Sequence, residues 1–348
     1  MKKNYEAWLV DEKDYPRQGG LRQKLEFILR YAILAPSAHN TQPWCFKIID
    51  NKILVYINQN RALGVSDIVR RQTYESIGAC LTNLQCALCH FGFKNNLDYH
   101  IDSAVDDNNH RQLVATIFIG DECESSCEIK RFFTFIQKRH SAKLAYLPDK
   151  LSDENMGIMQ TLVADKSGIN LHFFSGADVI KNFSQIVALG TIEAFNNKEF
   201  CRELSEWVRP SWTKRGDGMP ASTVGIPFIL SGLVPFVIAH FNTGKMQARD
   251  VAVLVKNTPT VGIISVDHET PLAWIQVGEG YQLLSLFLTS IGFDNAPMGA
   301  PIESDAAKYE LKISAGITGY PAIFFRIGVQ KKVVDLAPRL SVQSCITV

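Results

Sequence analysis

The sequence predicts an α+β fold in which two related units, each a mainly antiparallel sheet flanked by helices, are joined in one chain. Two observations lead to this prediction. A helical stretch at residues 76–93 recurs at 276–293 without a gap, and a short strand-like run follows each copy, at 115–120 and 324–328. Self-similarity at a fixed spacing is the sequence signature of a repeated structural unit.

The composition is that of a folded globular protein. Of the 348 residues, 46% are hydrophobic and 20% are charged, close to the globular average, which argues against disorder and fibrous repeats. The 36 Lys and Arg against 35 Asp and Glu give a net charge of +1. That balance offers no electrostatic attraction for nucleic acid or for an anionic membrane surface, so we expect small-molecule partners instead.

Identical residues occupy five positions of the two helical stretches, related by a shift of 200 residues. The pairs are Gly78 and Gly278, Leu84 and Leu284, Leu88 and Leu288, Gly92 and Gly292, and Phe93 and Phe293. In both copies apolar residues recur at helical spacing and a glycine ends the helix, as a C-terminal cap does. The runs ATIFIG and FFRIG combine β-branched and aromatic residues and end in glycine, which is typical of strands.

The repeat also predicts the domain organisation. Acidic and small residues interrupt the pattern at 121–126, so we place the joint there and expect one half over 1–125 and the other over 126–348. The second half carries an insertion, 181–248, without a counterpart in the first. A long ordered insertion in a repeated fold is more often functional than decorative, so we expect a lid.

Two segments bear on location. The first 18 residues are polar, carry charges of both signs and lack the apolar core of a signal peptide, which favours the cytoplasm. Residues 224–239, VGIPFILSGLVPFVIA, are apolar almost throughout but short for a membrane span, and they contain Pro227 and Pro235. We expect a segment that is buried or covers an interface.

The eight cysteines do not form a disulfide framework typical of a chain of this size. Cys86, Cys89, Cys123 and Cys127 have roughly the spacing of zinc ligands, which leaves a structural metal site as one hypothesis. Cys86 and Cys89, however, fall on an apolar helix face. Because free cysteine is among the most buried residue types, buried structural thiols are favoured over a metal site.

A helix-like run at 21–35 leads into the sequence PSAHNTQPW. Pro36 ends the helix, and the small or amide side chains of Ser37, Ala38 and Asn40 let the backbone approach a flat ligand closely. A plain connection between helix and strand is the alternative.

More than 100 residues later, a second segment contains cationic and hydroxyl hydrogen-bond donors close together. Arg139, His140, Ser141 and Lys143 lie within five positions. Charge-assisted donors so close together can converge on a phosphate. A solvated charge run at the end of a helix fits the same residues equally well.

Together the two segments resemble the FMN-dependent nitroreductase family. APSAHNTQPW is similar to its flavin loop, APS-x-x-N-x-QPW, and KRHSAK to its phosphate-binding RHS-x-K segment. In that family a homodimer builds each FMN site from the loop of one subunit and the phosphate segment of the other. Here the loop lies in the first half and the phosphate segment in the second, while LVADKSGINLHFF stands where the loop would recur. The resemblance therefore implies a fused dimer that keeps one of two sites.

The resemblance implies further contacts. The turn at 292–303, GFDNAPMGAPIE, resembles a family element along the flavin, so the backbone at Pro297, Met298 and Gly299 would face the isoalloxazine, with the Gly299 amide on flavin N5. Arg339, in APRLSVQ, resembles the family's last phosphate-contacting arginine, the alternative being a surface salt bridge. No catalytic acid or base is expected, because a bound flavin supplies the chemistry.

The fused arrangement and its insertion look most like the Acg subgroup, in which one site is lost and a lid covers the other. The implied activity is the reduction of a nitroaromatic or quinone-type acceptor at a single FMN, with NADH or NADPH as electron donor. The implied alternative is a protein that binds or stores FMN under a closed lid without turnover. A fused dimer could act as a monomer.

Overall fold

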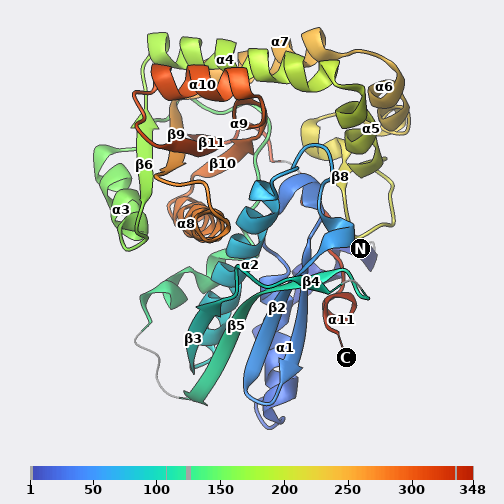
Figure 1. The fold of residues 1–348 in the computed structure, drawn as a ribbon, viewed down its shortest axis with the longest axis vertical. Helices are drawn as coiled ribbons and strands as arrows, with labels where there is room; N and C mark the ends of the chain where they lie inside the picture. The colour runs from blue at the N-terminus through green and yellow to red at the C-terminus, as the bar shows by residue number, and fades with distance from the viewer. Residues whose placement is uncertain (1–2, 107, 123–126, 334, 348) are drawn as a thin grey trace.

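The computed structural model describes residues 3–106, 108–122, 127–333 and 335–347. Two antiparallel sheets stand at opposite ends of the molecule, and two long helices, α2 (Arg71–His90) and α8 (Pro271–Ser290), cross between them (Figure 1). The predicted α+β class, with antiparallel sheets flanked by helices, is confirmed.

The first sheet belongs to the first half of the chain. Its strands, in spatial order, are β1 (Trp44–Ile49), β2 (Lys52–Asn58), β5 (Arg111–Glu122) and β3 (Phe93–Tyr99), with the short β4 (Val105–Asp106) beside β5. Helix α1 (Leu21–Ala32) packs against α2 on one face of this sheet. All the neighbouring strands are antiparallel.

The second sheet repeats this arrangement. Its spatial order is β6 (Ile169–Phe174), β9 (Thr260–Val266), β11 (Tyr320–Gly328) and β10 (Asp294–Met298). In chain order, both sheets therefore run first, second, fourth, third. The register repeats as well, since Asn95 pairs with Ile119 and Asn295 with Ile327. The internal repeat inferred from the helices thus extends to the strands.

The two long helices meet at a reciprocal contact. A Cβ on Gly78 would lie 1.9 Å from the carbonyl oxygen of Ile275, and a Cβ on Gly278 would lie 1.9 Å from that of Glu75. The partners are related by the same shift of 200 residues as the glycines themselves. Such reciprocity is the mark of a twofold interface, so the halves pack as the subunits of a dimer do.

Glycine also ends both helices, as predicted. Gly92 and Gly292 follow the two helix ends with φ of 84° and 79°, a conformation that side chains rarely adopt. The strands that follow, β3 and β10, therefore start within one residue of equivalent positions in the two halves.

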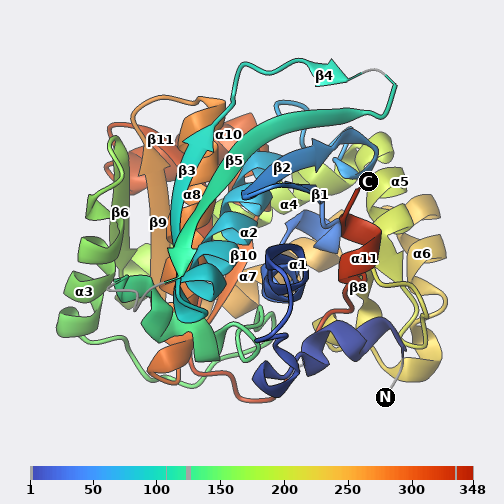
Figure 2. The same cartoon turned by 90° about the horizontal axis from the view of Figure 1, so that it is seen from below.

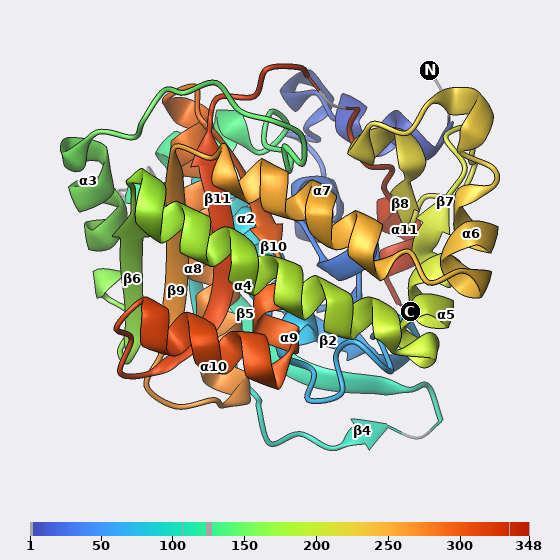
Figure 3. The ribbon, with the colours of Figure 1, turned by 90° about the horizontal axis from the view of Figure 1, so that it is seen from above.

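The extra structure of the second half lies between β6 and β9, where the first half has only residues 50 and 51 between β1 and β2. It contains α4 (Ala177–Asn196), α5 (Lys198–Trp207), β7 (Val208–Arg209), β8 (Met219–Pro220), α6 (Val234–His240) and α7 (Gly244–Lys256). Helices α4 and α7 lie side by side over the outer face of the second sheet (Figure 3). The predicted insertion, 181–248, falls inside this segment, and the stretch from 208 to 240 projects beyond the sheet.

Both ends of the second half wrap around the first. The 3-10 segment Glu128–Phe135 packs against α2, where the ring of Phe133 stacks on His90 at 3.7 Å. At the other end, α11 (Val342–Cys345) lies beside α1 and β1 (Figure 2), and the Thr347 amide donates to the carbonyl of Phe46 at 2.7 Å. Residues 123–126, in the predicted joint, lie outside the described part of the chain.

The cysteines at 86 and 89 are buried thiols, as favoured by the sequence. Burial raises the pKa of the Cys86 thiol well above its ordinary value. Cys123 lies outside the described residues, and among those described no group of three or more His, Cys, Asp or Glu could hold a metal ion.

The apolar segment at 224–239 is not buried. Phe228, Ile229 and Leu230 form a 3-10 turn before α6 and are 59%, 85% and 53% exposed. Helix α6 itself packs on α5 and on β7. The expectation of burial is therefore wrong for these residues. Over its described residues, the chain has no helix long and apolar enough to cross a membrane.

Candidate functional site

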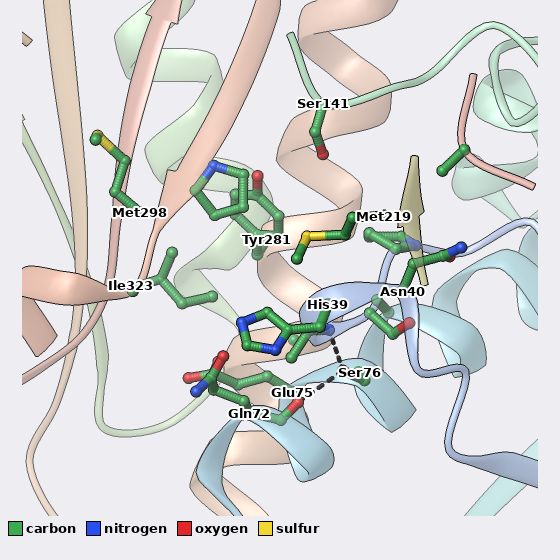
Figure 4. Close-up of a pocket in the computed structure, with 18 of the residues that line it drawn as sticks. His39, Asn40, Gln72, Glu75, Ser76, Ser141, Met219, Tyr281, Met298 and Ile323 are labelled. Carbon is green, nitrogen blue, oxygen red and sulfur yellow. Dashed lines mark hydrogen bonds between the residues drawn. The ribbon is translucent and has the colours of Figure 1, made fainter. Parts of the chain in front are cut away.

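A cavity of about 260 Å³ lies between the two halves, and all twelve residues predicted for the site line it. Asn40, Ser141 and Met298 are labelled among its lining residues in Figure 4. The first half contributes Pro36, Ser37, Ala38 and Asn40; the second contributes Arg139, His140, Ser141, Lys143, Pro297, Met298, Gly299 and Arg339. Segments separated by up to 300 residues in the chain therefore converge on one space.

The loop after α1 is held in a strained conformation. His39, Asn40 and Gln42 all have positive φ, of 47°, 56° and 53°. Non-glycine residues rarely adopt this region, and such strain persists only where the surroundings hold it. The Ser37 hydroxyl accepts from the Gln42 amide at 2.9 Å, and the Ala38 amide donates to the Ser76 hydroxyl at 3.3 Å. Both bonds fix the loop against α2 and against itself.

Asn40 joins this loop to two distant segments. Its Nδ2 donates to the carbonyls of Gly218 and Pro338, each at 2.9 Å, and its Oδ1 accepts from Arg339 at 2.8 Å. Gln42 adds a bond from its Nε2 to the Gly216 carbonyl at 2.8 Å. The insertion and the C-terminal segment are thus fastened to the predicted flavin loop.

Arg339 is buried, with 5% of its surface exposed, and has no carboxylate partner among the described residues. The alternative of a surface salt bridge is therefore wrong. Its guanidinium donates to the carbonyls of Leu34 and Ala35, each at 3.1 Å, and lies over the Trp8 ring at 4.8 Å. Burial, with the nearby charge of Arg139, lowers its pKa to about 9. Arg339 lines the cavity, but its Nη2 bonds to the segment after α1 and its Nη1 to Asn40 and the carbonyls of Ala337 and Pro338.

The backbone of the predicted phosphate segment is held from behind. The Ala142 amide donates to the Asn295 carbonyl at 3.0 Å, and the Tyr146 hydroxyl donates to the Ala142 carbonyl at 2.8 Å. Arg326, on β11 and only 1% exposed, donates to the carbonyls of Lys143 and Leu144 at 3.0 and 3.2 Å. Sequence reasoning missed Arg326, although a lone charge in the apolar strand YPAIFFRIG is a usable signal.

Two cations of this segment face the cavity without an anionic partner in the described chain. Arg139 is 3% exposed, its buried Nε has no hydrogen-bond partner, and burial lowers its pKa to about 10. The Lys143 ammonium contacts only the Met219 sulfur, at 3.5 Å, and burial lowers its pKa too. A buried cation without a counter-charge is costly, so these groups favour an anion in the cavity.

His140 is oriented differently from its neighbours. Its Nε2 lies 2.8 Å from the Gln330 amide nitrogen and 3.8 Å from the Asp294 carboxylate, and its Nδ1 lies 3.1 Å from the Lys138 carbonyl. The ring therefore bonds to the protein, whereas the Ser141 side chain points into the cavity (Figure 4).

The far end of the cavity carries carboxyl and amide groups from α2 and from the turn after β10. Arg71 and Glu75 pair at 3.0 Å, and the Gln72 Nε2 donates to Glu303 Oε1 at 2.9 Å. Burial raises the pKa of Glu75 and of Glu303 to about 7. The Glu303 carboxylate covers Gly299, since a Cβ there would meet its Oε1 at 2.0 Å. No motif in the sequence pointed to these side chains.

His39 occupies the middle of the cavity, between Met219 and Tyr281 on one side and Gln72 and Glu75 on the other (Figure 4). Its Nδ1 is buried without a hydrogen-bond partner in the described chain. Burial, and secondarily the charge of Lys143, lowers the pKa of His39 to about 4, so the ring is neutral near pH 7.

The equivalent position on the other side of the pseudo-twofold is filled. The shift of 200 residues relates Ala79 and Gly299, which line the cavity, to Glu279 and Tyr99. The Tyr99 hydroxyl donates to Glu279 Oε1 at 2.7 Å, and Lys166 pairs with Glu279 Oε2 at 2.5 Å. The connection before β6, residues 165–168, replaces the eleven-residue connection 33–43 of the first half.

The chain is similar to curated NAD(P)H nitroreductases. Two from strains of Mycobacterium tuberculosis are each 24% identical over 313 residues, covering 86% of this chain and 83% of the relative. PigM of Serratia sp. is 22% identical over 338 residues, covering 93% of both chains. Over most of its length, the chain is thus similar to proteins that carry the name NAD(P)H nitroreductase.

Solved structures and family models add the following. The FMN-dependent nitroreductase NfnB from Mycobacterium smegmatis, crystallised with NADPH, overlaps 64% of this chain and 99% of its own, with 16% identity and a TM-score of 0.40. No protein-family model matches this nitroreductase-like chain.

Proposed function

We propose that this protein binds one FMN in the cavity between its halves and reduces nitroaromatic or quinone-type acceptors with electrons from NADH or NADPH. The observation that carries the proposal is the pair of cations Arg139, which is buried, and Lys143, which is partly buried. Both face the same cavity as the 36–40 loop, and neither has an anionic partner in the described chain. The similarity to NAD(P)H nitroreductases along 86% or more of the chain supports the same function.

The residues present fit FMN. Arg139, Ser141 and Lys143 would hold the phosphate, while Pro297, Met298 and Ile323 provide apolar walls for a flat ring. The Gly299 backbone amide would face flavin N5. Bound FMN supplies hydride acceptance and electron transfer to the acceptor, and the protein's part is to bind it, orient it and exclude water.

A single site is supported by what fills the equivalent position. Glu279 is 4% exposed and is bonded to both Tyr99 and Lys166, so opening a second cavity there would break a buried ion pair. The residues 165–168 also offer too short a connection to repeat the loop that carries Asn40.

An Acg-like lid is supported by the insertion. Met219 and Thr223 line the cavity, and Asn40 and Gln42 bond to the backbone of Gly218 and Gly216. These fastenings favour the second candidate function, in which FMN is bound or stored beneath a lid without turnover. Steady-state oxidation of NADH or NADPH with nitrofurazone or menadione separates the two, because rates no faster than with free FMN would refute the reductase.

The first experiment is an absorbance spectrum of the purified protein before and after heat release, followed by titration with FMN. We expect one FMN per chain and loss of binding in the Arg139→Ala plus Ser141→Ala variant. The exposed Arg131, in the segment just before, supplies the control Arg131→Ala, which should bind FMN normally. A colourless protein that FMN cannot titrate would refute the proposal.

A further inference from the structure

The segment around α6 lies at one edge of the molecule (Figures 1 and 3), and six of its large apolar side chains are exposed. We call it the apolar tip. Its members are Phe228 (59% exposed), Ile229 (85%), Leu230 (53%), Leu233 (61%), Phe236 (56%) and Phe241 (58%). Single exposed apolar side chains are ordinary, but a contiguous group of this kind marks an interaction surface.

The tip belongs to an unusually uncharged stretch of chain. Residues 218–244 contain no Asp, Glu, Lys or Arg, whereas charged residues make up 20% of the whole sequence. Trp212, 45% exposed, packs on the edge of the tip, with its ring 5.2 Å from that of Phe228. An amphipathic aromatic beside exposed Phe, Ile and Leu is typical of a segment that lies in a membrane interface.

Basic residues flank the stretch on both sides. Lys214 and Arg215 precede it and Lys245 and Arg249 follow it, all exposed. Two acidic residues lie near them. Asp217 pairs with Arg215 but also with Arg61 and Arg209, and Asp250 is exposed beside Arg249, so the cations still outnumber the carboxylates. The net charge of +1 for the whole chain therefore hides a local basic rim.

We propose that the apolar tip docks onto an anionic lipid bilayer, with its apolar side chains in the interfacial region and the basic rim against the lipid headgroups. The tip does not span the bilayer, since α6 has only seven residues. A second copy of this chain fits less well, because a twofold contact through the tip would bring two rims of the same charge together. This docking does not depend on the proposed flavin chemistry.

Two neighbouring features favour this occupant further. Four consecutive residues, 227–230, are exposed, so the tip projects as a protrusion rather than presenting a flat or grooved face. Helix α5, which packs on α6, leaves the net charge of the rim unchanged, because its exposed Lys198 and Arg202 are balanced by the exposed Glu199 and Glu206. A projecting apolar segment with a basic rim fits a deformable anionic surface better than a rigid protein face.

The test is co-sedimentation of the full-length protein with phosphatidylcholine vesicles, with and without phosphatidylserine. We expect binding to the anionic vesicles that falls with added salt and weakens at least about tenfold in the Phe228→Ser plus Ile229→Ser variant. The control is Tyr309→Ser plus Ile313→Ser on α10 (Asp305–Ser314), which replaces two apolar side chains that are 63% and 61% exposed outside the tip. It should bind as the unchanged protein does.

Charge is tested separately with Lys245→Glu plus Arg249→Glu, which should abolish the preference for anionic vesicles. Thermal melts of each variant check that it is folded. Absence of vesicle binding by the unchanged protein, or equal binding by the tip variant and the control, would overturn the proposal. So would a dimer that the tip variant converts to a monomer while neither protein binds vesicles, because the occupant would then be a second copy.

Discussion

Asp217 is one of the side chains that fasten the insertion to the first half, and Asp217→Asn tests its part of that fastening. Its carboxylate pairs with Arg61 at 3.0 Å, with Arg209 at 3.2 Å and with Arg215 at 3.0 Å, and the residue is 5% exposed. Arg61 lies in the first half and also donates to the Thr41 carbonyl at 2.6 Å. The contact therefore joins the insertion directly to the loop beside Asn40.

The loss of unfolding free energy expected for Asp217→Asn follows from the pKa of the Asp217 carboxyl. Although burial alone would raise it, hydrogen bonds and charges from Arg215 and Arg61 lower the pKa of Asp217 to about 2, from 3.8. A shift of nearly two units corresponds to about 2 kcal/mol of stability. The variant also leaves three arginines without their shared counter-charge, so we expect a loss of about 2–4 kcal/mol in the free energy of unfolding.

The pH dependence gives a second signature. Because the folded-state pKa is depressed, the stabilisation is complete above the unfolded value of 3.8 and is lost as pH falls through about 2. Urea unfolding should therefore show a constant difference between the variant and the unchanged protein near neutral pH, narrowing below about pH 4. FMN titration should show weaker binding by the variant, since Gly216 and Gly218 hold Gln42 and Asn40.

Asp250→Asn is the matched control, because it makes the same chemical change at an exposed position on α7, in the same extra segment between β6 and β9. We expect it to stay within about 0.5 kcal/mol of the unchanged protein. If Asp217→Asn were equally silent, the ion-pair cluster would contribute nothing to docking the insertion, and the reasoning from its geometry would be refuted.

Two further predictions concern the helix contact and the cavity. Gly278→Ala should lower the free energy of unfolding by about 3 kcal/mol, because its Cβ would meet the Glu75 carbonyl at 1.9 Å. Gly157→Ala in α3 (Asp153–Ala164), with nothing within 4 Å of the new Cβ, should be neutral or slightly stabilising. Equal effects in urea unfolding would contradict the reciprocal contact. The pKa of His39 is lowered from 6.5 to about 4. The free energy of unfolding should therefore be independent of this group above pH 6.5 and should fall by about 3 kcal/mol in all as the pH falls toward 4. His39→Asn should flatten that fall while the exposed His268→Asn does not, and an unchanged fall in the His39 variant would count against its burial as a neutral ring.

The sequence could predict the repeat and the members of the cavity wall because both are recorded in local patterns. The shift of 200 residues appears in glycines that end helices, and each wall segment carries its own short motif. What it could not predict are side chains whose role depends on a distant partner. Glu303 matters because it covers Gly299 and accepts from Gln72, and Arg326 matters because it reaches the carbonyls of 142–144.

The exposed apolar tip shows a different limit. Apolar composition predicts removal from water, but it does not say what covers the side chains. In residues 224–239 the prolines break the run, and the resulting short helix packs on α5 along one side only. Burial inside the protein was therefore the wrong inference for Phe228 and Ile229, although their composition does indicate an interface.

The two halves show how a duplicated fold can keep its scaffold while changing its sites. Both halves keep glycine where the long helices cross, because a Cβ on Gly78 or on Gly278 would meet a backbone carbonyl of the other helix. The cavity positions are not shared: Ala79 and Gly299 leave space on one side, and Glu279 and Tyr99 fill it on the other. In a homodimer one sequence serves both sites, so a substitution that fills one fills the other. When the halves are joined in one chain, each position can change separately. Glu279, Tyr99 and Lys166 can therefore form a bonded network at one position. The other position keeps a cavity whose cations, Arg139 and Lys143, have no carboxylate partner in the described chain.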